Sequence, residues 1–166
     1  LPWAGSVADI SKVTLMLGDR LGERARARAL LAGMDAKLAY ARAHAARPRV
    51  RTLVYEPNGY VTAGGATDEM MQAAGLINAA PQMKLTRLGT LPIETVVGSA
   101  PELLVLNGQE SPSSRADLLL HHPALAALRG RTKMAWARLT PLLCPGPWSA
   151  DAAVEFAKLA ARARRP

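Results

Sequence analysis

The chain has 166 residues, of which 49% are hydrophobic, and it carries a formal net charge of +8. This length suits one compact domain or one lobe of a larger protein. The hydrophobic fraction excludes a disordered chain, and no apolar run approaches the roughly 20 residues that a membrane helix needs. The one cysteine, Cys144, cannot form an internal disulfide and cannot hold a structural zinc by itself.

The opening residues give no sign of a secretion signal. The stretch LPWAGSVADISKV lacks the basic start, the long apolar run and the small-residue cleavage site of such a signal. We therefore expect either a cytosolic protein or a chain that begins after a signal was removed.

Most of the positive charge lies in one segment. Residues 20–51 carry nine basic side chains against Glu23 and Asp35, whereas residues 52–150 carry seven of each sign. Such a run usually forms the solvated face of a helix, with an anionic partner or a nucleic acid as the alternatives. A nucleic-acid reader usually adds aromatic stacking groups, and Tyr40 is the only aromatic residue of this segment.

Two helices are predicted at the amino-terminal end. Ser6 and Asp9 form a helix-start signature, and the helix that they open should end near residue 18. Over residues 19–46 the chain consists mostly of good helix formers, with apolar side chains at three- and four-residue steps. We expect one unbroken rod of about 26 residues and roughly 40 Å, which ends where Pro48 disfavours helical geometry.

Strands alternate with helices over the rest of the chain. Apolar strand candidates lie at residues 51–55, 103–106 and 133–137. Helix candidates lie at residues 67–75, 92–99, 113–120, 123–128 and about 149–164. This alternation predicts an α/β fold: a small three-layer lobe with a parallel sheet and right-handed crossovers, preceded by the long helix.

The carboxyl ends of the predicted strands indicate a binding site, because ligands of such sheets bind at the loops that leave those ends. These loops are predicted at residues 56–66, 107–114 and 139–148. Aromatic and amide side chains gather in or beside them: Tyr55, Asn58, Tyr60, Asn107, Gln109, Trp136 and Trp148. Such groups suit a large, partly apolar and partly polar small molecule, although any of the rings can equally pack in the core. We predict a shallow cleft with aromatic walls.

Motifs for catalysis, nucleotides or metals are weak. The Gly-rich piece at residues 63–66 could present backbone donors to an anion, but it lacks the lysine of a phosphate-binding loop, and a sharp turn into a helix also explains it. Nothing in the spacing pairs Cys144 with a histidine, and the adjacent His121 and His122 make a poor metal chelate. The sequence therefore predicts no catalytic residue, no metal site and no cofactor.

Several segments together resemble a known family. They are SVADISKVTLMLGDRLGERARARALLAGM, the helix-closing AAGLINAA after the Gly-rich turn, LPIETVVGSAPELLVLNG, HHPALAAL and CPGPWSADAAVEFAKLA. In this order they resemble the helical-backbone (class III) substrate-binding proteins of ABC importers, which deliver ferric siderophores, cobalamin or haem to a membrane permease. The resemblance covers nearly the whole chain, but only the second half of the family. The family normally has Asp where Glu102 stands, a departure with little bearing on function.

The resemblance implies one half of a noncatalytic, two-lobed carrier. Residues 1–18 would form a short lead-in helix, residues 19–47 the connecting backbone helix, and residues 48–166 the carboxyl-terminal α/β lobe, with the amino-terminal lobe absent. The protein would lie in the periplasm, or outside the cytoplasmic membrane on a lipid anchor, with its signal peptide outside this chain. A metal chelate or corrinoid would rest between the lobes, against the aromatic and amide residues named above, and nucleic acid would not be a partner.

The resemblance also implies a residue that docks onto the permease. Family members place one acidic residue on each lobe to enter arginine pockets of the permease, and Glu94 matches the second of these. The alternative is a carboxylate stabilised by the dipole of its own helix, an effect of roughly 0.3–1 kcal/mol. A charge of this kind would govern encounter and register more than affinity.

Two other classes of protein remain open from the residues alone. A small α/β enzyme or nucleotide-binding domain would need an acid, a base or a nucleophile that converge in one pocket. A basic interaction module acting through residues 20–51 would bind polyanions with steep salt dependence. The importer interpretation itself depends on the rod, and we expect separate hairpinned pieces, or buried strand tips, to contradict it.

Overall fold

The computed structural model describes residues 4–110 and 114–164. The α-helices are α1 (Val7–Arg20), α2 (Arg24–Ala43), α3 (Gly65–Ala73), α4 (Ile93–Ser99) and α5 (Ala150–Ala163). The strands are β1 (Val50–Tyr55), β2 (Tyr60–Val61), β3 (Leu76–Asn78), β4 (Gly89–Thr90), β5 (Leu103–Asn107) and β6 (Lys133–Ala137). Short 3₁₀ helices span Pro57–Gly59, Ala80–Met83, Arg115–His121, Pro123–Leu128, Thr140–Leu142 and Pro147–Ser149. No helix of this part of the chain is both long and apolar enough to cross a membrane.

A parallel sheet forms the centre of the fold. Its strand order among the described residues is β3-β1-β5-β6, with Leu53 beside Leu104 and Leu104 beside Met134. The two central strands, β1 and β5, are almost continuously buried because helices cover both of their faces. A separate antiparallel ribbon pairs β2 with β4. The predicted α/β class with a parallel sheet is confirmed, and so are the three predicted strands.

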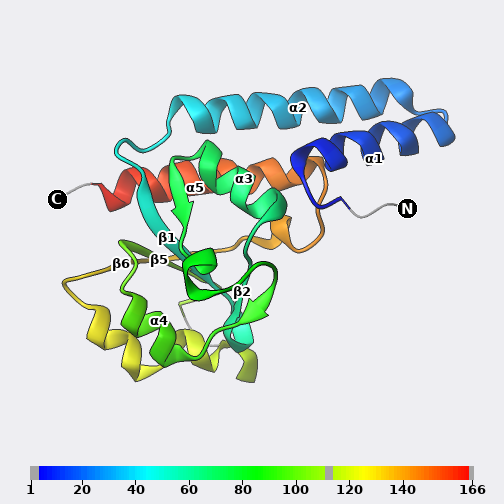
Figure 1. The fold of residues 1–166 in the computed structure, drawn as a ribbon. Helices are drawn as coiled ribbons and strands as arrows, with labels where there is room; N and C mark the ends of the chain where they lie inside the picture. The colour runs from blue at the N-terminus through cyan, green and yellow to red at the C-terminus, as the bar shows by residue number, and fades with distance from the viewer. Residues whose placement is uncertain (1–3, 111–113, 165–166) are drawn as a thin grey trace.

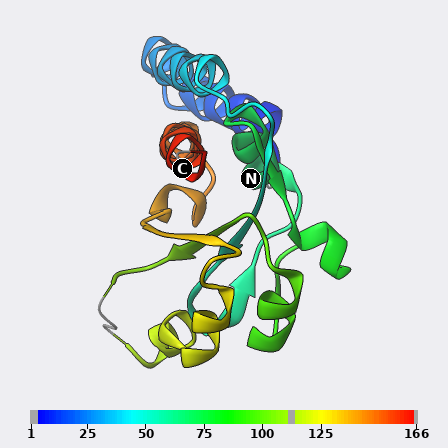
Figure 2. The same ribbon diagram turned by 90° about the vertical axis from the view of Figure 1, so that its left-hand side faces the viewer.

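Layers of helices cover the two faces of the sheet (Figures 1 and 2). On one face α1, α2, α3 and α5 pack over a core that includes Met34, Val54 and Phe156. On the other face α4 and the 3₁₀ helices of residues 115–128 cover a second core that includes Leu53 and Leu128. Neighbouring residues of β1 enter opposite cores, as the two-residue period of a strand requires. This is the predicted three-layer lobe.

The predicted rod at residues 19–47 is wrong in both of its bounds. Its helix, α2, begins at Arg24, ends at Ala43 and has 20 residues, or roughly 30 Å. Residues 21–23 turn the chain back, and Gly22 there adopts a positive φ of 73°. As a result α1 and α2 lie side by side as a helical hairpin (Figure 1), although α2 itself is unbroken. The close approach of α1 to α2 requires a glycine at residue 18, because a Cβ on Gly18 would lie 2.5 Å from the Cβ of Ala27.

The remaining elements differ from prediction mainly at their ends and in three short strands, β2, β3 and β4, that were not predicted. The helices predicted at residues 67–75, 92–99 and 149–164 are α3, α4 and α5. Residues 115–121 and 123–128 are 3₁₀ rather than α-helical, and Ser113, the predicted start of the first, lies outside the described residues. β3 was not predicted, because three residues show no periodicity and only their pairing with β1 makes them a strand.

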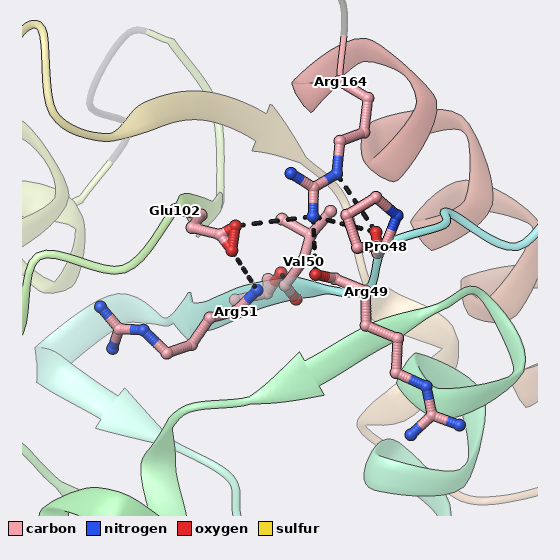
Figure 3. A network of polar contacts seen from close by, with 7 residues as sticks. Pro48, Arg49, Val50, Arg51, Glu102 and Arg164 are labelled. Carbon is pink, nitrogen blue, oxygen red and sulfur yellow. Dashed lines mark hydrogen bonds and ion pairs between the residues drawn. The ribbon is translucent and has the colours of Figure 1, made fainter.

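The end of α5 is tied to the amino edge of the sheet (Figure 3). The guanidinium of Arg164 donates to the carbonyl oxygens of Pro48 at 2.9 Å and Arg49 at 2.6 Å. It also lies 3.6 Å from a carboxylate oxygen of Glu102, which accepts a hydrogen bond from the backbone N–H of Arg51 at 3.3 Å. Glu102 therefore makes its contacts at the amino edge of the sheet, opposite the carboxyl ends of the strands.

Candidate functional site

A cavity of about 610 Å³ lies at the carboxyl ends of β1 and β5, and we name it the edge cavity. Loops that follow β1, β2 and β6 line it, together with the last residue of β5, residues 86–88 and the segment that enters α1. The lining residues are Ala4, Gly5, Glu56, Tyr60, Thr62, Ala63, Gly64, Gly65, Ala66, Thr67, Thr86, Arg87, Leu88, Asn107, Leu142, Leu143, Pro145 and Ser149. Each of the three loops predicted at the carboxyl edge, at residues 56–66, 107–114 and 139–148, contributes lining residues. A cavity therefore lies where the site was predicted.

A small polar network forms the inner part of the edge cavity. Glu56 follows β1 directly, Asn107 ends β5, and Thr62 follows the ribbon strand β2. The backbone N–H of Leu139 donates to Oδ1 of Asn107 at 2.8 Å, which leaves the amide NH₂ of Asn107 free to donate to the Glu56 carboxylate. Burial raises the pKa of Glu56, while hydrogen bonds from Asn107 and Thr62 oppose that rise. The inner part of the cavity thus contains one partly desolvated carboxyl group with two neutral side chains beside it.

The Gly-rich turn forms one wall of the edge cavity. Gly64 and Gly65 both have positive φ, and a Cβ on Gly65 would lie 2.7 Å from the carbonyl oxygen of Gly5. That carbonyl accepts a hydrogen bond from the backbone N–H of Ala66 at 2.8 Å. The turn into α3 therefore explains the glycines, and the backbone donor of Ala66 is already occupied by the chain rather than open to an anion.

The rim of the edge cavity is mostly apolar. Leu88 is 58% exposed, Leu143 is 65% exposed and Tyr60 is 43% exposed. Arg87 is the one charged side chain on this rim among the described lining residues. Large exposed apolar side chains around a hollow are typical of a surface that a ligand or another protein covers.

The structure brings only part of the predicted aromatic and amide set together. Tyr60 and Asn107 line the edge cavity. Gln109 and Trp136 line a second, more open hollow at the ends of β5 and β6, where the ring of Trp136 stacks on His121 with centroids 4.8 Å apart. The predicted cleft is therefore two neighbouring hollows rather than one aromatic-walled groove.

Three predicted site residues lie elsewhere. Tyr55 is fully buried and its hydroxyl donates to the carbonyl oxygen of Leu91 at 3.1 Å, so it packs in the core and cannot form a wall of the cavity. Asn58 is an exposed turn residue with a φ of 59°, which asparagine tolerates. Trp148 is exposed, and its indole N–H donates to the carbonyl oxygen of Cys144 at 2.8 Å.

The candidate docking residue is accessible. Glu94 lies in the first turn of α4 and is exposed. Its negative charge is close enough to the hydroxyl of Tyr55 to add to the rise in the pKa of that tyrosine, which burial mainly causes. An exposed carboxylate at the start of a short helix is compatible with docking and equally with a favourable helix-dipole interaction.

Sequence reasoning missed the polar and apolar residues that do most to shape the edge cavity. The sequence did give a reason to consider Glu56 and Thr62 as site residues, because both belong to a loop predicted to leave the carboxyl edge of the sheet. There was no such reason in the sequence for Arg87 and Leu88, since their position beside the cavity depends on the unpredicted strand β3 and on the ribbon of β2 and β4. Leu143 could have been singled out only as a large apolar residue in a predicted loop.

The histidines and the cysteine make local contacts of their own. Within residues 4–110 and 114–164, no group of three or more His, Cys, Asp or Glu side chains is placed to hold a metal ion. Cys144 is exposed, and its backbone carbonyl rather than its thiol contacts Trp148. His121 stacks on Trp136, whereas the Nδ1 of His122 accepts from the backbone N–H of Ala124, so the two histidines serve different local contacts.

Comparisons with known proteins identify a family and similar folds. A family model described as periplasmic binding protein matches residues 5–130. The solved structures that resemble the chain include the periplasmic haem-binding protein RhuT from Roseiflexus sp. RS-1, with a TM-score of 0.73 and 24% identity over 97% of this chain and 65% of that one. An ABC-type Fe³⁺-hydroxamate transport protein from Saccharomonospora viridis has a TM-score of 0.72 and 21% identity over 95% of this chain and 57% of that one.

A third similar structure is the periplasmic haem-binding protein HutB of Vibrio cholerae, with a TM-score of 0.72 and 16% identity over 93% of this chain and 64% of that one. The chain thus spans about two thirds or less of the length of these three structures. No curated protein sequence matches the chain.

Proposed function

Because the chain belongs to the periplasmic binding protein family, we propose that it is part of the substrate-binding component of an ABC importer. The component would capture a metal chelate, namely a ferric siderophore, a corrinoid or haem, and deliver it to a membrane permease. It would work in the periplasm, or outside the cytoplasmic membrane on a lipid anchor. Similar solved structures named as periplasmic haem-binding or Fe³⁺-hydroxamate transport proteins support this proposal.

The observation that carries the proposal is the edge cavity. Its volume of about 610 Å³ lies within the range of small-molecule sites, and its rim is apolar around a few fixed polar groups. Because the iron or cobalt of a chelate is held by the chelator, the protein need not supply metal ligands. We therefore assign ligand contact to Tyr60 and Asn107 among the predicted residues, and add Glu56 and Leu143.

The structured lobe would form one half of the ligand site. The helix α2 would act as the connecting helix, with a second lobe on the other side of the chelate. A single continuous helix resists bending because each backbone hydrogen bond must be broken to open it, so the lobes would rock rather than swing widely. Glu94 would face the permease, at the carboxyl-edge end of α4.

A noncatalytic carrier fits the residues of the cavity better than an enzyme. The titratable side chains that line it are Glu56, Tyr60 and Arg87, and Glu56 is engaged by two neutral hydrogen-bond donors. Among the described lining residues there is no histidine, lysine or cysteine that could act with Glu56 as an acid–base pair or nucleophile. This supports the binding role over the α/β enzyme alternative.

Binding measurements on two matched leucine variants test the proposal. Leu143→Asp places a charge on the rim of the edge cavity, whereas Leu118→Asp places it on a leucine that is similarly exposed, at 57%, and lies outside the cavity. Tryptophan fluorescence of the gene product that contains this chain would be titrated with ferric hydroxamates, haemin and cobalamin. We expect at least one of them to bind, and Leu143→Asp to weaken it about tenfold or more by removing apolar contact.

The Leu118→Asp variant is the control and should bind like the unaltered protein. If none of the three ligand classes binds to the unaltered protein, the proposed function is wrong. Equal loss of affinity in both variants would show that the edge cavity is not the binding site.

A further inference from the structure

One carboxyl group of the edge cavity, that of Glu56, forms no ion pair in the part of the chain that the structure describes. The other charged side chain that lines the cavity, Arg87, is exposed on the rim, and the groups that contact the Glu56 carboxylate, Thr62 and Asn107, are neutral. Within residues 4–110 and 114–164, the negative charge of Glu56 therefore has no ion-pair partner in this largely apolar hollow.

The geometry leaves part of this carboxylate free to accept from a bound molecule. An ionised carboxylate offers about four lone-pair positions. Thr62 and Asn107, which also line the cavity, are the neutral side chains whose hydrogen bonding opposes the rise in the pKa of Glu56, and the hydrogen bond from the backbone N–H of Leu139 to Oδ1 of Asn107 holds that amide in place. The backbone of Glu56 is also held in place, since its N–H donates to the carbonyl oxygen of Tyr60 at 2.9 Å. The backbone of Glu56 and the neighbouring amide of Asn107 are thus held in place before any ligand arrives.

A ligand that fills the edge cavity removes the remaining water from Glu56. Leaving a carboxylate desolvated and unpaired is costly, because neither of its two neutral donors carries a compensating charge. A cationic N–H donor on the ligand restores both the hydrogen bond and the charge balance, and such charge-assisted bonds are the strong ones. An anionic group in the same place would meet repulsion instead.

We propose that the edge cavity recognises its ligand through a positively charged amine, or a similar cationic hydrogen-bond donor, that pairs with the carboxylate of Glu56. Glu56 is then a specificity-determining residue for the proposed chelate ligand, and the inference rests on the proposed function. The apolar rim formed by Leu88 and Leu143 covers the rest of such a ligand.

Two ferric chelates that differ by one charge test this inference. Ferrioxamine B ends in a free ammonium group, and its N-acetyl derivative replaces that group with a neutral amide. Equilibrium dialysis near neutral pH measures the Kd of each chelate for the gene product that contains this chain, unaltered and as Glu56→Gln. We expect the ammonium form to bind about tenfold more tightly, and Glu56→Gln to abolish this preference.

Glu110→Gln is the matched control, because Glu110 is exposed at the neighbouring hollow and does not line the edge cavity. It should keep the preference for the ammonium form. Equal affinities of the two chelates for the unaltered protein, or a preference that survives in Glu56→Gln, would overturn the inference and leave the proposed function intact. The first of these comparisons needs no variant, so it decides the matter even if Glu56→Gln fails to fold.

Haemin and cobalamin separate the inference from the proposed function. Binding of haemin or cobalamin without binding of ferrioxamine B would overturn the inference alone, since neither of those ligands offers an ammonium group. If none of the four compounds binds, the proposed function fails, and the inference fails with it.

Discussion

Tyr55 and Glu56 are adjacent in the sequence, yet they have unrelated roles. Tyr55 is the last residue of β1, and its ring enters the core that α4 covers. Glu56 is the first residue beyond the strand and reaches the edge cavity. An aromatic residue at a strand end suggests the wall of a binding site whether its ring points into the core or toward the cavity. Only the direction of the side chain in the folded structure separates a core residue from a site residue.

The titration of Glu56 gives a prediction at this scale. Because burial raises its pKa, the folded state holds the proton more tightly than the unfolded chain does. The free energy of unfolding should therefore fall as the pH rises from the ordinary pKa of a glutamate through the raised pKa of Glu56. Urea unfolding of this chain over that pH range should show a smaller fall for Glu56→Gln, whereas Glu110→Gln should behave like the unaltered protein. An identical pH slope in Glu56→Gln would contradict the raised pKa.

At the scale of elements, two glycine turns decide where helices begin. Gly22 closes the hairpin between α1 and α2, and Gly65 starts α3 beneath the segment that enters α1. The hairpin does not count against the importer interpretation, because the family match runs through both helices. The expectation that an unbroken rod is required was too strict: α2 is continuous, and α1 lies beside it rather than extending it.

Alanine substitutions at two glycines test the importance of the Gly-rich turn. Gly65→Ala adds a Cβ 2.7 Å from the carbonyl oxygen of Gly5 at a residue with a φ of 65°, so we expect a loss of about 1–3 kcal/mol in the free energy of unfolding. Gly33→Ala lies on the exposed side of α2 with nothing within 4 Å, and should instead stabilise the protein by about 0.5–1 kcal/mol. Denaturant unfolding checks both, and equal effects of the two substitutions would contradict this account.

At the scale of the whole molecule, the functional features are separated from the main concentration of charge. The edge cavity lies at the carboxyl ends of the strands, whereas exposed arginines such as Arg26, Arg28 and Arg42 project from α2, which forms an outer layer of the lobe (Figure 2). None of them lines the cavity, so ligand binding should not depend on them. This arrangement matches the solvated-helix interpretation of the basic segment.

Charge reversal at Glu94 tests the proposed contact with the permease. In the gene product that contains this chain, Glu94→Lys should weaken association with the permease and lower the transport rate, each by about tenfold, while chelate affinity stays unchanged. The control Glu23→Lys changes the charge equally at an exposed residue of the helical hairpin and should leave transport unaltered. Unchanged association and transport for Glu94→Lys would remove this assignment.

Local patterns were enough to predict the class of the fold and the edge of the sheet at which the edge cavity lies. Strands such as residues 103–106 are short apolar runs between helix signals, and parallel strands necessarily bring their carboxyl ends to one edge. The loops at that edge were therefore identifiable, including the one that contains Glu56 and Tyr60. The three-residue strand β3 was not, because its only evidence is its hydrogen-bonded neighbour β1.

The sequence by itself determined the parallel α/β lobe, its preceding helices and the family, since all three depend on residue order and periodicity. Only the tertiary structure decided that Tyr55 is buried and that Trp136 and Trp148 lie outside the edge cavity. It also decided that Glu56 lies beside Thr62 and Asn107, which belong to other elements. The reason is physical: burial and hydrogen bonding between distant segments depend on how strands and helices pack together, and no local pattern contains that information.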